Sequence, residues 1–117
     1  MERRLDEAQV LCACSAYEQK YYFNPRFSSL PKQIQEELQI MSVLMTEEVG
    51  GVFTMEFDED GSLYMSTTAK ENDFSFDEIG SHLKIKEYRK KYAQLLENLE
   101  TYYRLMIVED RKNVTSD

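Results

Sequence analysis

The stretch KIKEYRKKYAQLLENLETYYRLMIV, residues 84–108, decides the fold of this chain. Apolar and aromatic side chains recur in it at spacings of three and four, and no glycine or proline interrupts them. These side chains are Ile85, Tyr88, Tyr92, Leu95, Leu99, Tyr102 and Met106. The spacing predicts an amphipathic helix, about 36 Å long at the usual rise per residue. We expect residues 85–106 to form an unbroken rod whose apolar side packs against a β-layer.

The two halves of this helix differ in the residues that border the apolar stripe. Lys84, Arg89 and Lys91 border a narrow stripe in the first half, as in a coiled coil. Leu96 and Tyr103 widen the stripe in the second half, as in a helix that lies on a globular core. Two interpretations stay open. The helix either belongs wholly to the core, or it packs on its own domain with one half and on a partner with the other.

The residues between positions 28 and 51 predict a second helix. Pro31 follows a serine pair and is typical of a first helical turn, and Gly50 and Gly51 are typical of a helix end. The expected inward stripe is Ile34, Leu38, Met41 and Met45. The stripe is widened by Ile40, Val43 and Leu44. We therefore expect this helix to be buried on more than one side.

The remaining segments indicate a small antiparallel sheet. Residues 52–57 and 63–68 alternate around an acidic, glycine-containing turn, which predicts a β-hairpin with one face on the core. Residues 74–76 are a candidate third strand. Residues 8–13 and 17–23 allow both strand and helix, and we favour extended structure for both.

The fold class predicted from these elements is α+β. An antiparallel β-hairpin or three-stranded meander packs in two layers against two helices, the C-terminal one long. We expect a single domain over residues 1–117, with the polar segments 1–7 and 109–117 as disordered tails.

Charge is unevenly distributed along the chain, whose net charge is −8. Between Glu36 and Glu78 there are twelve acidic residues and one basic residue, whereas Lys84 to Lys91 holds five basic residues and one acidic residue. The acidic middle argues against nucleic acid and anionic membranes as partners. The basic patch needs an acidic neighbour, either the acidic middle of the same chain or an antiparallel partner helix in a homodimer.

A protein-binding surface is the favoured role for the exposed aromatic and basic residues. The candidate partner surface is Tyr88, Arg89, Lys91, Tyr92, Tyr21 and Tyr22. Stacking of nucleic-acid bases on the aromatic residues is the less favoured interpretation, because the chain is strongly acidic. The partner is expected to be another protein, or a second copy of this chain bound through the C-terminal helix.

A candidate acidic pocket flanks the predicted sheet. It would be formed by Glu47, Glu48, Asp77, Glu78 and His82. Paired carboxylates can act as acid and base, or bind a hard cation. The competing interpretation is that they are solvated helix-end acids. The run from Asp58 to Gly61 resembles the start of a calcium loop but lacks the later ligands, since the twelfth position is Ala69.

Metal, redox and export signals are weak in this sequence. Cys12 and Cys14 have no second cysteine pair, and His82 is the only histidine, so we expect two buried thiols and no cofactor or metal. No run approaches the about 18 apolar residues of a membrane span, and the charged N-terminus lacks the apolar core of a secretion signal. The expected location is the cytoplasm.

Four short runs occur together in this chain: YEQKYYFN at 17–24, TEEVGG at 46–51, FDEDG at 57–61 and DEIGS at 77–81. In this order they resemble a family of small acidic proteins of unknown function from clostridia and related Firmicutes. The resemblance covers most of the chain, from Val10 to Met106. It implies a bacterial cytoplasmic protein and assigns no activity, ligand or catalytic residue.

The function predicted from the sequence is a non-enzymatic protein–protein interaction module. The charge-segregated surface and the long amphipathic helix favour it, and no assembled nucleophile or phosphate loop is visible. One alternative is a small-molecule-binding or hydrolytic protein that uses the acidic pocket near Glu47, Glu48 and Asp77. Another is an inhibitor or immunity-type protein that masks a basic site on its target.

Overall fold

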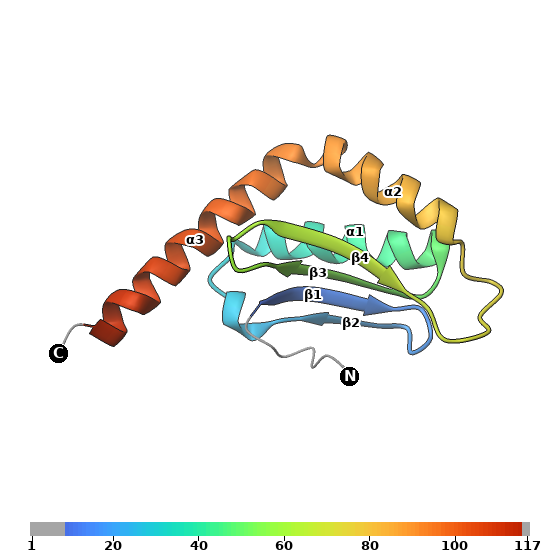
Figure 1. The fold of residues 1–117 in the computed structure, drawn as a ribbon, viewed down its shortest axis with the longest axis horizontal. Helices are drawn as coiled ribbons and strands as arrows, with labels where there is room; N and C mark the ends of the chain where they lie inside the picture. Colours follow the sequence, from blue (N-terminus) through green and yellow to red (C-terminus); the bar gives the residue numbers. More distant parts are fainter. Residues whose placement is uncertain (1–8, 116–117) are drawn as a thin grey trace.

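The fold comes from a computed structural model that describes the backbone of residues 9–115 and the side chains of residues 9–110. Two strands come first, β1 (Val10–Ser15) and β2 (Lys20–Phe23), followed by a single turn of 3-10 helix, η1 (Pro25–Phe27). Helix α1 (Lys32–Val49) leads into the hairpin of β3 (Val52–Phe57) and β4 (Leu63–Thr68). Two consecutive helices, α2 (Glu78–Lys91) and α3 (Ala93–Thr115), end the described chain (Figure 1). The expected tail at residues 1–7 lies outside the described residues.

The four strands form one antiparallel sheet in the order β2-β1-β3-β4. The predicted α+β class is confirmed, as is the hairpin at 52–68. The two ambiguous N-terminal segments are strands, which explains why the sheet is larger than the predicted hairpin or meander. The prediction of a third strand at residues 74–76 is wrong: these residues lie in an irregular loop, and Phe74 is 93 % exposed.

The core lies between one face of the sheet and the helices. α1 crosses β1, β2 and β3, while α2 and α3 lie against β4 (Figure 1). Alternation along β3 turns Phe53, Met55 and Phe57 toward the helices. Tyr103 of α3 stacks on Phe57 with ring centroids 4.1 Å apart, and Leu99 is buried in the same cluster. This contact fixes α3 on the sheet.

Helix α1 is buried on one side only. Leu38, Met41 and Met45 are completely buried, as predicted. Ile40 and Leu44, expected to extend the buried surface, are 58 % and 44 % exposed. The prediction that this helix is buried on more than one side was therefore wrong, because the sheet and α2 cover only the opposite stripe.

The unbroken rod predicted over residues 85–106 is also wrong. Tyr92 leaves the helical conformation at φ −108° and ψ 24°, so the stretch is divided into α2 and α3, which run in different directions (Figure 1). The amide of Tyr92 still donates to Tyr88, and its carbonyl accepts from Leu96, so the break spans one residue. The bend lets the narrow stripe of α2 meet α1 and the wide stripe of α3 meet β4.

The last helix is longer than expected at its C-terminal end. α3 has 23 residues and continues to Thr115, through the segment predicted to be a disordered tail from residue 109. Its last turns extend past the sheet (Figure 1). Among the helices of the described residues, none combines the length and the apolar character needed to cross a bilayer.

Candidate functional site

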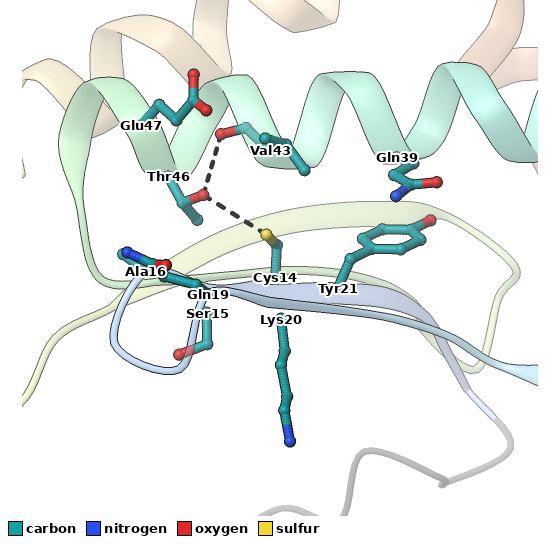
Figure 2. A pocket seen from close by; sticks show the side chains of 10 residues that line it. All are labelled: Cys14, Ser15, Ala16, Gln19, Lys20, Tyr21, Gln39, Val43, Thr46 and Glu47. Carbon is teal, nitrogen blue, oxygen red and sulfur yellow. Dashed lines mark hydrogen bonds between the residues drawn. The ribbon is translucent and has the colours of Figure 1, made fainter.

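A groove of about 520 Å³ lies between α1 and the β1–β2 hairpin, at the sheet edge formed by β2 (Figure 2). Cys14 and Tyr21 form part of its lining and point toward α1, whereas Ser15 and Lys20 point away from that helix (Figure 2). Strand alternation explains this division, because neighbouring residues of a strand face opposite sides. The wall on α1 consists of Gln39, Val43, Thr46 and Glu47. The groove thus combines a polar helix flank with the side of an edge strand.

Two thiols contact hydroxyl groups beneath this groove. The Sγ atom of Cys12 lies 3.7 Å from the hydroxyl of Ser42, and the Sγ atom of Cys14 lies 3.5 Å from that of Thr46. Ser42 and Thr46 give their own hydrogens to α1 carbonyls, including that of Leu38 at 2.8 Å, so the thiols act as the donors. Both cysteines are buried, as predicted.

Burial also determines the protonation state of the inner thiol. It raises the pKa of Cys12 to about 11, despite the opposing effect of the hydrogen bond with Ser42. The group is therefore a neutral thiol near pH 7 and a poor nucleophile. The two thiols join the sheet to α1 through these contacts.

The hydroxyl group of Tyr21 is buried at the floor of the groove. It has no hydrogen-bond partner among the described residues. Burial raises its pKa above the usual range, and the neighbouring thiols of Cys12 and Cys14 raise it further. Leaving a buried polar group without a partner costs about 1–3 kcal/mol, so this hydroxyl is a weak point in the packing of the hairpin against α1.

Several acidic residues lie on or near the groove. Glu47 of α1 and Glu18 of the hairpin turn are exposed, and Glu36 lies seven residues before Val43 on the same side of the helix. The positive charge of Lys20 lies on the opposite face of the sheet (Figure 2). A ligand in this groove therefore meets the carboxylate of Glu47 on its helical wall.

The opposite sheet edge, formed by β4, is covered by side chains of α2 and α3. The amide of Leu63 donates to a carboxylate oxygen of Glu100 at 2.7 Å, and the carbonyl of Leu63 accepts from Arg89 at 3.3 Å. Further along, Thr67 donates to the hydroxyl of Ser81 at 3.0 Å. These contacts cap the Leu63 end of this edge from within the chain.

The residues predicted to form one partner surface occupy four different places. Tyr88 is buried and donates to the carbonyl of Met41 at 2.9 Å, so it belongs to the core. Tyr21 lines the groove, and Tyr22 follows it in the strand and faces the other side of the sheet. Arg89, Lys91 and Tyr92 lie on the α2 end, where Lys91 covers the ring of Tyr92.

The residues of the predicted acidic pocket are likewise separated. Glu47 lines the groove, and Glu48 pairs with Lys84 at 3.1 Å across the α1–α2 contact. Asp77 caps α2 by accepting from the amide of Gly80 at 2.8 Å. The other two predicted residues, Glu78 and His82, line a separate hollow of about 600 Å³ beside β4. Within residues 9–110 no group of three or more His, Cys, Asp or Glu side chains is placed to hold a metal ion.

Sequence reasoning missed most of the groove. Val43 was assigned to the core, and neither Gln39 nor Thr46 was singled out. A signal existed, because Gln39, Val43 and Thr46 recur at spacings of four and three along one flank of the apolar stripe. That flank lies beside Tyr21 only because α1, which connects β2 to β3, packs back over the β1–β2 hairpin in the folded chain.

Comparison with known proteins gives a family and no function. No curated protein and no solved structure matches the chain. One family model matches residues 8–111, nearly the whole described chain, and it agrees with the resemblance found in the sequence. The chain therefore belongs to the family of unknown function DUF6145.

Proposed function

We propose that this chain is a non-catalytic module that binds a segment of another protein in the groove between α1 and β2. One observation carries the proposal: side chains of α2 and α3 bind the outward main-chain groups of Leu63 at the β4 edge, whereas a lined groove lies beside the β2 edge. Protein interfaces combine aromatic contacts with polar groups, and the groove has both in Tyr21, Gln39 and Thr46.

The arrangement of the acidic residues supports binding over catalysis. Paired carboxylates act as acid and base only when they are close together in environments that separate their pKa values. Here the three acids are apart: Glu47 lines the groove, Glu48 forms an ion pair with Lys84, and Asp77 caps α2. The buried thiol of Cys12 is neutral and held by Ser42, so it does not supply a nucleophile.

Binding of short peptides to the full chain tests the proposal. An immobilised library of random peptides, each about ten residues long to exceed the length of β2, would be probed with the purified protein. Retained peptides would then be titrated by fluorescence polarisation. We expect specific binding that Val43→Lys weakens by about tenfold or more, because the new charge enters the groove.

The matched control is Ile40→Lys on the exposed side of the same helix, where the side chain is already 58 % exposed. It should leave the affinity unchanged. Equal affinities for both variants, or a library without specific binders, would remove the proposal. A dimer in light scattering that Val43→Lys dissociates would make a second copy the occupant and would contradict a foreign partner.

A further inference from the structure

The outer edge of β2 presents main-chain groups that the sheet does not use. In an antiparallel pair, alternate residues exchange hydrogen bonds with the partner strand, and the residues between them point outward. The amide of Asn24 donates to the carbonyl of Leu11 at 3.0 Å, which sets the phase of the β1–β2 pair. The pairs Ala13–Tyr22 and Ser15–Lys20 follow in that phase. The amide and carbonyl groups of Tyr21 and Phe23 therefore point away from the sheet.

The β4 edge confirms this way of assigning the phase. There the amide of Asp58 donates to the carbonyl of Ser62 at 2.9 Å, so the neighbouring pair Phe57–Leu63 is the outward-pointing one. Both main-chain groups of Leu63 do point outward, and Glu100 and Arg89 bind them. On β2, no described residue forms an equivalent bond to the outward groups of Tyr21 or Phe23.

The space beside β2 suits an extended chain. A strand added to a sheet lies about 5 Å from its neighbour, which places it along the groove between β2 and α1. Its side chains would alternate. Those opposite Tyr21 and Phe23 would point toward Gln39 and Val43, and those between them would point to the opposite face with Lys20.

The charge of the groove selects among extended chains. The carboxylate of Glu47 lies on its helical wall, Glu36 lies about two turns before Val43 on the same side of α1, and the whole chain carries a net charge of −8. A segment with lysine or arginine gains from both the local and the overall field, whereas an acidic segment is repelled. A second copy of this acidic chain is disfavoured for the same reason.

We infer that the groove binds an extended, basic segment of a partner protein, which joins the sheet beside β2 as a fifth strand. Its main chain bonds to Tyr21 and Phe23, and its lysine or arginine side chains lie near Glu47 and Glu36. This inference rests on the proposed binding function and adds the conformation and charge of the partner. It is the β-strand addition used by other peptide-binding domains.

Amide hydrogen exchange of the free protein tests the open edge directly. In two-dimensional NMR spectra, the amides of Tyr21 and Phe23 should exchange fast, while those of Tyr22 and Leu63 should be protected because each donates a hydrogen bond. Protected amides at Tyr21 and Phe23 in the free protein would overturn the inference, since the edge would already be occupied.

Peptide probes test the binding mode. Basic peptides of about ten residues from the library would be compared with copies in which glutamate replaces each lysine and arginine, and with copies N-methylated at one residue at a time. We expect N-methylation at every second residue to weaken binding by about tenfold and the positions between to tolerate it, because strand pairing uses alternate amides. Bound peptide should also protect the amides of Tyr21 and Phe23.

The outcomes separate this inference from the proposed function. Peptides whose binding is sensitive to Val43→Lys, but which show a spacing of three or four in the N-methyl scan, would bind as helices. The groove would then remain the binding site, and the proposal of a fifth strand would be rejected. Tighter binding of the glutamate copies would overturn the proposed basic charge of the partner and leave its proposed conformation untouched. A library without specific binders would remove both proposals together.

Discussion

The two edges of the sheet differ in how their main-chain groups are treated. At β4, Glu100 and Arg89 bind the outward groups of Leu63, and two helices lie alongside. At β2, no described residue binds the outward groups of Tyr21 and Phe23, and Tyr21 lines a groove. Exposed edges invite uncontrolled pairing, and proteins usually cover or shorten them. The edge formed by β2 is only four residues long and lies beside a lined groove, and it is the site of the proposed binding.

The largest effect is expected where α3 closes the β4 edge. Tyr103 is 4 % exposed and stacks on Phe57. Replacing it with alanine should reduce the free energy of unfolding by about 3–5 kcal/mol, as for other buried aromatic residues. Urea denaturation gives the value, and Thr101→Ala on the exposed side of α3 is the control. A loss below about 1 kcal/mol would mean that α3 does not hold this edge.

The next effect is the pH dependence of stability that arises from Cys12, which lies beneath the groove. Burial raises the pKa of Cys12 from 9.0 to about 11, so the folded state retains this proton more strongly than the unfolded state. Its contribution to stability is complete below about pH 9 and is lost as the pH rises toward 11, a decrease of about 2–3 kcal/mol.

Urea denaturation across this range measures the decrease for the wild type and for Cys12→Ala. The variant lacks the thiol and should show a shallower decline, although its stability at neutral pH is lower from lost packing. The tyrosines titrate in both proteins, so the difference between the two slopes reports the thiol together with its effect on the neighbouring Tyr21. Parallel slopes would contradict the assigned burial effect.

A smaller effect is expected for the carboxylate that caps the β4 edge. Glu100→Ala leaves the amide of Leu63 without its 2.7 Å partner and should cost about 1–3 kcal/mol. Glu100→Gln retains an acceptor oxygen and should lose less. Glu97→Ala, at an exposed position of the same helix, is the control. Faster hydrogen exchange at Leu63 in Glu100→Ala alone would link the loss to this edge.

The smallest effect compares two tyrosine hydroxyls. Tyr88→Phe removes a hydroxyl that donates to Met41 at 2.9 Å, and should cost about 1 kcal/mol. Tyr21→Phe removes a buried hydroxyl without a partner in the described chain, and should be neutral or stabilising by up to about 1 kcal/mol. Thermal denaturation of both variants gives the ranking. A destabilised Tyr21→Phe would reveal a bond that this hydroxyl makes.

Local patterns predicted much of the fold and little of the site. Alternation in residues 52–68 and the glycine pair at 50–51 fixed a hairpin and a helix end, and both are confirmed. No glycine or proline marks the break at Tyr92 in the sequence. The break arises from the packing of α2 and α3 against different neighbours. Tyr21 and Tyr22 were grouped as one surface, yet strand alternation sends them to opposite faces.

The contacts that distinguish the two edges were beyond sequence reasoning for a related cause. Glu100 lies 37 residues from Leu63 and Arg89 lies 26 residues from it, and no periodicity joins them. The groove combines α1 with a hairpin whose strands were themselves ambiguous. A single sequence predicts elements from their own residues, but an edge is open or closed according to elements elsewhere in the chain.

The position of β1 has a consequence for how the protein is made. It is the first described strand, yet it lies between β2 and β3, and Val10 pairs with Glu56. A nascent chain that has emerged only as far as α1 can form the β1–β2 hairpin but leaves the inner side of β1 without its neighbour. Such distant pairing slows folding. We expect the sheet to assemble only after β3 has left the ribosome, so β1 depends on residues synthesised some 40 positions later.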